Sequence, residues 1–453
     1  MNDVTVLIVV NDEFEYAKLS VECIRKINDI DDLRVVLVDN GSTDGLKDWA
    51  LSQTDIAFVY MDEGITPFGK LLSEVVRNLS IDGNILVMEP QYLPTPGTVD
   101  HMRKVLDSQN SIGMVGALIN GESHHQKLPD EITNYEKAAE YTIGNSIGQP
   151  ITVIGLSSGP FMINRKVLDK IGGFDEEIGS PFFVTKSLAL KLLEHEYRCT
   201  VVTNAIFWNV GDNKYYSKFS DRFVLQDEGV MEHLYGMHYF NFQYNNNLIL
   251  EIDSDYDSEI RVLEVGCDCG ATLLEIMNRF PKARVYGCEL NKVAVRVAAH
   301  FVNVKMCNIE DENIPFDVNF DYIILGDVLE HLHDPRKTIK YVSGMLNKHG
   351  KIIASIPNVM HISVVEDLLK GNFTYKEMGL LDKTHIHLFT YNEIIRMFNE
   401  TGFEIEDVCG TYISINDRQA ELISELMDIE PQTQRFMYET YQYVLRAAQR
   451  NCS

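Results

Sequence analysis

The hydrophobic residues of this chain gather into short runs, which alternate with longer stretches of mixed apolar and polar residues. In the first half of the chain these runs predict strands, which we place at residues 4–10, 34–40, 56–60, 84–89 and 111–119. Short buried strands that alternate with helices are typical of a mostly parallel sheet covered on both faces. The pattern therefore predicts an α/β domain over residues 1–215.

A second series of apolar runs begins after the acidic segment at residues 253–259. Its expected strands are IRVLEVG, ARVYGCEL, VNVKMCN, FDYIILGD and GKIIASIPN. They predict a second α/β domain over residues 251–416, which a linker or helical lead-in at residues 216–250 joins to the first. Residues 417–453 contain two amphipathic stretches, which we expect to be helices that pack on a domain or make a homodimer contact.

The charge balance narrows the classes of partner. The 453 residues include 67 Asp and Glu against 40 Lys and Arg, which gives a net charge of −27. Such an acidic surface repels phosphate backbones and anionic lipids, so we expect no nucleic-acid partner. The apolar runs fall short of the roughly 20 residues that span a bilayer, and the acidic-flanked N-terminus does not resemble a signal peptide. We therefore expect a cytoplasmic protein without an integral membrane segment.

Cysteine usage points to the same compartment. The eight Cys are scattered, and Cys199, Cys288 and Cys307 fall in or beside expected core strands. Scattered cysteines of this kind are typical of a reduced protein, so we expect no disulfide framework.

The segment IRVLEVGCDCGATLLEIMNRF predicts a ligand-binding loop between a strand and a helix. The strand reaches Glu264 near its end, and Gly266 and Gly270 bracket the loop. Glycines let a ligand approach the backbone closely, and loop amides at a helix N-terminus favour a carboxylate or phosphate. Dinucleotide-binding loops have similar spacing, so the loop alone does not define the ligand.

Polar residues also follow the next three strands. Glu289 ends the second strand, where it is suited to accept hydrogen bonds from ribose hydroxyls. Asn308 or Glu310, after the third strand, could meet an adenine amino group, and Asp327 ends the fourth strand.

Over about residues 250–410 this series resembles the class I S-adenosylmethionine-dependent methyltransferases. The resemblance implies a Rossmann-like sheet and S-adenosyl-L-methionine as the cofactor. It implies a donor site formed by Glu264, Gly266, Cys267, Gly270, Glu289, Leu290, Asn308, Ile309, Gly326 and Asp327. In the family the first loop holds the methionine end, the acid at Glu289 holds the ribose, and the position of Asn308 faces the adenine. Here Cys267-Asp268-Cys269 replaces the middle glycine of the loop.

The tail of the second domain is similar to a branch of methyltransferases that is common among surface-polysaccharide and glycan biosynthesis genes. The matching positions are Asn358, His361, Tyr375, Gly379, Asp382, Thr384, His385, Phe389 and Thr390. The resemblance implies a sugar or glycan acceptor, and we expect Tyr375 and Asp382 on the acceptor side of the cleft.

A sugar hydroxyl needs a proton acceptor when it attacks a methyl sulfonium, and histidine suits this role at neutral pH. His385 is the first candidate base and His331 the second. The alternative for His385 is a hydrogen-bonding clamp of its loop, paired with Asp382.

A metal site is not expected in this domain. Glu330, His331 and His333 have ligand side chains, but on a helix Glu330 and His331 would point in different directions. Cys267 and Cys269 have no second Cys pair nearby, which argues against a zinc or redox site.

Residues 3–212 resemble family 2 glycosyltransferases of the GT-A fold. The matching segments are VTVLIVVND, LRVVLVDNGSTDGL, GITPFGKLLSEVVRNL, ILVMEPQYLPTPGTVD and SSGPFMINRKVLDKIGGFDEE. The resemblance implies a sheet of the nucleotide-diphospho-sugar transferase type. It also implies that Asp39 lies where the family contacts the base and ribose of a sugar nucleotide.

The catalytic positions of that family are changed in this chain. Its metal-holding acidic turn reads Glu89-Pro90-Gln91, its acidic pair falls at Val184-Thr185, and its late histidine is Asn209. Divalent cations of this kind prefer anionic oxygen ligands. Glu89 and Asp175 remain as candidate acids, with Asp39 and Gln91 as candidate contacts to an acceptor or sugar nucleotide.

The resulting hypothesis is a methyltransferase of a sugar or glycan, in which a non-catalytic first domain binds the glycan, sugar-nucleotide or glycosylated acceptor. A bifunctional glycosyltransferase and methyltransferase is the first alternative. A non-enzymatic scaffold is the second, and the intact order of the donor-site motifs argues against it.

Overall fold

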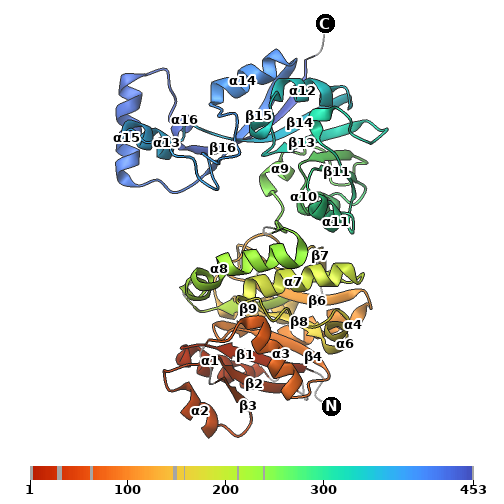
Figure 1. Cartoon of the computed structure of the whole chain (residues 1–453), viewed down its shortest axis with the longest axis vertical. Coiled ribbons are helices and arrows are strands. Elements are labelled where there is room, and N and C mark those ends of the chain that lie inside the picture. The colour runs from red at the N-terminus through yellow and green to blue at the C-terminus, as the bar shows by residue number, and fades with distance from the viewer. Residues whose placement is uncertain are drawn as a thin grey trace. The chain divides into compact units, whose positions relative to one another are not determined.

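The computed structural model describes residues 4–27, 33–61, 65–145, 150–157, 159–211, 214–237 and 240–450. The chain forms two compact units, Met1–Gln243 and Tyr244–Ser453. Figure 1 shows both units. Both are α/β units built on one sheet each.

The first unit has a mixed sheet in the order β3-β2-β1-β4-β8-β6-β9-β5, and β7 pairs with β9. Its strands are β1 (Val4–Val10), β2 (Leu33–Asp39), β3 (Ala57–Tyr60), β4 (Asn84–Met88), β5 (Tyr92–Pro94), β6 (Ile112–Ile119), β7 (Ile151–Val153), β8 (Phe161–Asn164) and β9 (Arg198–Asn209). Strands β1 to β4 are parallel to one another where they pair, and β8 is antiparallel to β4 and β6. The arrangement is compatible with a GT-A-like fold.

The five strands expected in this unit are confirmed as β1, β2, β3, β4 and β6. All residues of β1 are buried, because β1 lies between two parallel neighbours and helices cover the sheet. The helices are α1 (Phe14–Ile27), α2 (Leu46–Ser52), α3 (Phe68–Asn78), α4 (Thr98–Ser108), η1 (His124–Gln126), α5 (Tyr135–Gly144), α6 (Arg165–Lys170), α7 (Pro181–Glu194) and α8 (Lys214–Tyr235).

The second unit has a sheet in the order β12-β11-β10-β13-β14-β16-β15. Its strands are β10 (Arg261–Val265), β11 (Arg284–Glu289), β12 (Asn303–Met306), β13 (Phe320–Gly326), β14 (Leu346–Pro357), β15 (Phe403–Tyr412) and β16 (Thr440–Gln449). The first five pair in parallel, which confirms the strands expected here. The strand order reverses between β10 and β13, and ligands of open α/β sheets bind at the carboxyl ends of the strands at such a point.

The helices of the second unit are α9 (Asn246–Leu250), α10 (Ala271–Arg279), α11 (Lys292–Ala298), η2 (Ile309–Asp311), η3 (Leu329–His331), α12 (Pro335–Ser343), α13 (Ile362–Leu369), α14 (Tyr391–Glu400), α15 (Asp417–Ile429) and α16 (Phe436–Glu439). Helices α10 and α11 lie beside β11 (Figure 1). No helix in the described ranges is long and apolar enough to cross a bilayer.

The end of the chain corrects one expectation from the sequence. The first of the two C-terminal helices is present as α15, but most of the second is strand β16, which pairs antiparallel with both β14 and β15. A strand inside a sheet is buried on both faces, so its apolar residues run on without strict alternation. Such a run cannot be told from a buried helix by periodicity alone, and this explains the error.

Candidate donor and acceptor site

The loop after β10 is tightly folded, and its glycines are required by that shape. Gly266 and Gly270 have φ angles of 70° and 83°, in the left-handed region that favours glycine. A Cβ atom on Gly266 would lie 2.9 Å from Cγ2 of Val328, and one on Gly270 would lie 3.1 Å from Cβ of Ala298. The backbone at both positions is therefore open only to a residue without a side chain.

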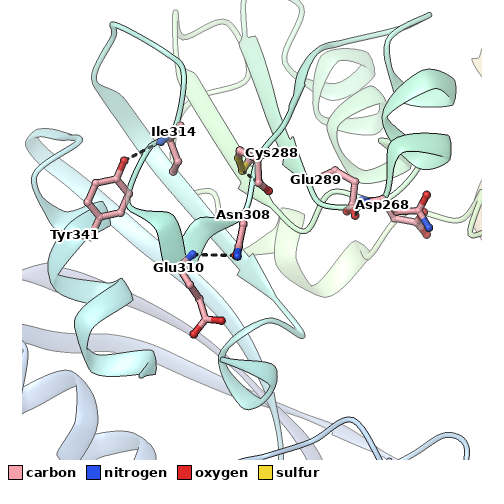
Figure 2. Close-up of a disulfide and its surroundings, with 9 residues drawn as sticks. Asp268, Cys288, Glu289, Asn308, Glu310, Ile314 and Tyr341 are labelled. Atoms are coloured by element: carbon pink, nitrogen blue, oxygen red, sulfur yellow. Dashed lines mark hydrogen bonds between the residues drawn. A yellow bond between two sulfur atoms is a disulfide. The ribbon is translucent and has the colours of Figure 1, made fainter. Parts of the chain in front are cut away.

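The Glu289 carboxylate lies directly against this loop (Figure 2). Its Oε2 accepts a hydrogen bond from the Asp268 N–H at 2.9 Å, and its Oε1 accepts one from the Asn291 N–H at 2.7 Å. The Gly266 N–H donates to the carbonyl oxygen of Cys288 at 2.8 Å. These bonds join the ends of β10 and β11 into one edge and fix the orientation of the carboxylate.

Glu264 is a buried acid beneath the same loop. One carboxylate oxygen is bonded to the Thr272 hydroxyl, and Oε2 has no hydrogen-bond partner within the described ranges. Burial, with smaller contributions from Asp268 and Glu289, raises the pKa of Glu264 to about 8. A buried acid with an unused acceptor oxygen suits a ligand that brings a positively charged donor group.

Asn308 and Ile309 follow β12 at the same edge. The Asn308 side chain accepts a hydrogen bond from the Glu310 N–H at 3.1 Å and thereby caps the short helix η2 (Figure 2). Ile309 is buried, whereas Leu290 leaves 68% of its surface exposed. The amide group of Asn308 therefore faces part of its own backbone, and Ile309 supplies apolar surface.

A disulfide joins Cys288 to Cys307, between the end of β11 and the segment that follows β12 (Figure 2). The expectation of reduced thiols is therefore wrong for this pair. The reason is register: the two Cα atoms lie 5.7 Å apart on paired strand ends, a spacing that composition does not reveal. Cys267 and Cys269 are buried free thiols, and burial raises the pKa of both.

Gly326 ends β13, Asp327 follows it, and both continue the edge on the other side of β10. Asp327 has a φ angle of 54°, its N–H donates to Ser355 Oγ at 3.0 Å, and its carboxylate accepts a hydrogen bond from the side chain of Gln442. Burial raises the pKa of Asp327 to about 6. Ser355 and Gln442 were not found from the sequence, because Ser355 reaches this edge through the pairing of β13 with β14 and Gln442 through the pairing of β14 with β16.

Glu330, His331 and His385 lie together beyond Asp327. Each offers one potential ligand atom, and these atoms all lie within 4.8 Å of one another. The His331 and His385 rings pack edge to face with centroids 4.8 Å apart. Residues 329–331 form a 3-10 turn rather than the expected helix, which changes the directions of Glu330 and His331. His333, grouped with them from the sequence, instead contacts Glu310 at 3.1 Å.

The loop that carries His385 is held to the 3-10 turn by its backbone. The N–H groups of Ile386 and His387 both donate to the carbonyl oxygen of Glu330 at 3.0 Å. Nδ1 of His385 bonds to the carbonyl oxygen of Leu380 at 3.2 Å, whereas the Asp382 carboxylate accepts from Thr384. The His385 ring is thus clamped, but by Leu380 and not by the side chain of Asp382. Tyr375, half exposed, packs against Phe373.

In the first unit the candidate residues Asp39, Glu89 and Gln91 are all buried at the carboxyl ends of β2 and β4. One Asp39 oxygen accepts from the Ser42 N–H at 2.7 Å, and burial raises the pKa of Asp39. Burial, with Glu13 and Glu122 nearby, raises the pKa of Glu89 to about 8. Gln91, two residues later, presents a neutral amide, which is a weaker ligand for a divalent cation than an anionic oxygen.

The other candidate positions of this unit are buried or make contacts within the unit. Burial acts to raise the pKa of Asp175, but hydrogen bonds from Lys191, Ser187 and Tyr235 outweigh it and lower the pKa. The Lys191 ion pair with Asp175 is 2.6 Å long. Val184 and Thr185 are buried in α7, and the Asn209 side chain accepts a hydrogen bond from the Gly211 N–H at 2.9 Å.

Comparison with known proteins defines the class of the second unit. Residues 237–408 match the family model of a methyltransferase domain. The C-terminal part of the chain is therefore a methyltransferase domain with a Rossmann-like fold, and its cofactor is S-adenosyl-L-methionine. The residues present fit this cofactor: the glycine loop gives access to the backbone, Glu289 presents oriented oxygens, and Glu264 has an unused acceptor.

Two curated proteins illustrate the relationship. A malonyl-[acyl-carrier protein] O-methyltransferase of Bacillus anthracis is 30% identical over 115 residues, which cover 24% of this chain and 43% of that protein. A probable S-adenosylmethionine-dependent methyltransferase of Mycolicibacterium smegmatis is 26% identical over 156 residues, which cover 33% of this chain and 54% of that protein. The chain thus spans about half the length of the curated relatives it matches.

Among solved structures, a mannosyltransferase from Pyrobaculum calidifontis in complex with GDP-mannose and Mn²⁺ aligns with a TM-score of 0.37 and 19% identity. The alignment covers 51% of this chain and 64% of that chain.

Proposed function

We propose that this protein transfers the methyl group of S-adenosyl-L-methionine to a hydroxyl of a sugar or glycan. The observation that carries the proposal is the continuous edge in which Glu264, the glycine loop, Glu289 and Asp327 meet, next to the paired histidines of the tail. When bound, the cofactor supplies an electrophilic methyl group. The residues of this chain then bind, orient and deprotonate.

We assign the donor-binding roles by position along this edge. Glu289 would accept hydrogen bonds from the ribose hydroxyls, because its carboxylate is already oriented by two backbone N–H groups. Glu264 would meet the ammonium group of the methionine end. Asn308 and Ile309 would face the adenine, and Gly326 with Asp327 would line the cleft near the methyl group.

The histidines supply a proton acceptor for the acceptor hydroxyl. Nδ1 of His385 faces a carbonyl oxygen, which can only accept, so Nδ1 carries the proton and Nε2 keeps its lone pair. Burial lowers the pKa of His385, which keeps the ring neutral at pH 7. His385 is our first candidate for the base and His331 the second, provided that no metal ion is bound to their ring nitrogens.

A saccharide acceptor is supported by the tail sequence and by the first unit. The tail matches the glycan-associated branch of methyltransferases at Tyr375, Asp382 and His385, and Tyr375 presents a half-exposed ring on which a sugar can stack. The first unit would bind the glycan or glycosylated acceptor without transferring sugar, because the neutral amide of Gln91 and the side chains of Val184, Thr185 and Asn209 offer no anionic ligand for a cation.

The experiment is methylation by the full-length protein with radiolabelled S-adenosyl-L-methionine. Acceptors are sugar nucleotides, oligosaccharides, and as controls a phenolic and a carboxylic acid acceptor. We expect label in a saccharide with wild-type protein and clearly less label with Glu289→Ala at a donor concentration near the wild-type dissociation constant. Transfer only to the control acceptors would contradict a saccharide as the acceptor. Absence of donor binding in calorimetry would contradict the methyltransferase activity itself.

A further inference from the structure

Three side chains from two distant segments meet at one point beside the donor edge. Glu330 and His331 belong to η3, and His385 comes from the loop after α13. Their potential ligand atoms lie within 4.8 Å of one another. Two backbone hydrogen bonds to the Glu330 carbonyl oxygen hold the two segments together, so the cluster is built into the fold.

Both imidazoles are held in the tautomer that metal ligation needs. Nδ1 of His331 lies 3.1 Å from the carbonyl oxygen of Thr384, and Nδ1 of His385 lies 3.2 Å from that of Leu380. A carbonyl oxygen can only accept, so each Nδ1 carries the hydrogen and each Nε2 presents a lone pair. Metal-bound histidines typically donate their other ring N–H to a carbonyl or carboxylate in this way.

The buried carboxylate of Glu330 also points to a bound cation. The residue is 1% exposed, and neither carboxylate oxygen has a hydrogen-bond partner among the residues described. A buried carboxylate without a partner is unfavourable, and burial raises the pKa of Glu330 well above its usual value. A cation at the cluster would supply the missing partner and keep Glu330 ionised.

We propose that Glu330, His331 and His385 bind one divalent transition-metal ion, of the Zn²⁺ class, beside the edge that Gly326 and Asp327 form. Two imidazole nitrogens and one carboxylate oxygen form a donor set suited to Zn²⁺, which keeps a fourth position open in such sites. Mg²⁺ prefers oxygen ligands and fits this set poorly. Zn–N and Zn–O bonds of about 2.0–2.2 Å require small side-chain rotations from the separations observed.

The open position of the ion would bind the acceptor oxygen. This role rests on the proposed function, whereas the proposal that an ion binds here is independent of it. An acceptor hydroxyl bound there would lose its proton more readily, to a water molecule from solvent. Its oxygen would then form a bond to the methyl carbon as the carbon–sulfur bond of the donor breaks, giving a methyl ether and the thioether. In this form the lone pairs of both histidines are used, and neither histidine is the base.

The test uses full-length protein stripped with a chelator and then titrated with ZnCl₂, with bound metal counted by mass spectrometry after gel filtration. We expect one tightly bound ion per chain. Glu330→Gln, which is nearly isosteric, and His385→Ala should each lower its affinity at least tenfold. The matched control is His333→Ala, because this imidazole lies in the same segment, is 85% exposed and contacts Glu310. The affinity of His333→Ala for Zn²⁺ should equal that of the wild-type protein.

A spectroscopic readout keeps the proposal testable if a variant folds poorly. Co²⁺ added to the stripped wild-type protein should give the intense visible absorption of a tetrahedral site with one equivalent, and Zn²⁺ should abolish it. No stoichiometric ion in the wild-type protein, or equal loss of the ion in Glu330→Gln and His333→Ala, would overturn the proposal. A bound ion together with failed saccharide methylation would support the metal site and contradict the proposed saccharide acceptor.

Discussion

The Glu289 carboxylate accepts a hydrogen bond at 2.9 Å from the backbone N–H of Asp268, which lies 21 residues earlier in the chain. This bond ties the end of one strand to the loop of its neighbour. Asp268 has a φ angle of 44°, a left-handed conformation that short polar side chains tolerate. The carboxylate therefore has two functions, since it fixes the loop backbone and presents an oriented acceptor to the donor.

Replacement of Glu289 should weaken the donor site without unfolding the unit. Hydrogen bonds to a charged group contribute about 1.5–3 kcal/mol. We therefore expect Glu289→Ala to weaken S-adenosyl-L-methionine binding by about tenfold or more, as measured by calorimetry. Glu289→Gln keeps one acceptor oxygen, so its donor affinity should lie between those of the wild-type protein and Glu289→Ala. Unchanged affinity in Glu289→Ala would remove this residue from the site.

The His385→Ala variant should separate the chemical step from binding. In the metal-free protein we expect turnover to fall by about 10²–10⁴-fold with donor affinity nearly unchanged, and His331→Ala to have a milder effect. A comparable loss of donor binding would instead assign His385 to the structure of its loop.

The pH dependence of stability follows from the same residue. Burial lowers the pKa of His385 in the folded state, so the unfolded chain binds the proton more readily. The stabilisation is therefore complete above the unfolded pKa of about 6.5 and is lost as the pH falls through and below it. His385→Ala should lose part of this acid sensitivity, as measured by denaturant unfolding between pH 5 and pH 8. An unchanged profile would contradict the burial of a neutral ring.

Reduction should loosen the adenine side of the donor site. The disulfide closes a loop across a sequence separation of 19 residues, and cross-links over loops of this size stabilise by about 3 kcal/mol. We expect a reductant to lower the melting temperature by several degrees and to weaken donor binding modestly. The double variant Cys288→Ala/Cys307→Ala should not respond to the reductant. Alkylation of both thiols in the untreated protein would contradict the bond.

The strands and the glycine loop could be predicted from the sequence because each rests on local signals. Apolar runs predicted β1 and β10, and the spacing of Gly266 and Gly270 predicted the turn between strand and helix. Strand β16 was missed because it is buried on both faces between β14 and β15. Its position depends on partners far away in the sequence, which local periodicity does not contain.

The histidine cluster was only partly predictable for a related reason. The sequence places Glu330 next to His331 and His333, but the contact with His385 forms because a loop more than 50 residues later folds back onto η3. The 3-10 turn then directs His333 toward Glu310. Likewise, Cys288 and Cys307 could be counted but not paired, because pairing depends on the register of β11 with β12.

The last prediction concerns the first unit. Sugar transfer with a divalent cation needs anionic oxygens at the diphosphate. Glu89 is buried with a pKa of about 8, and the next polar position is the neutral amide of Gln91. We therefore expect the full-length protein to release no sugar from common sugar nucleotides in the presence of Mn²⁺ at pH 7, as measured by chromatography of the products. Sugar transfer that is present at pH 7 and disappears in Glu89→Ala would show that this unit is catalytic and that the enzyme is bifunctional.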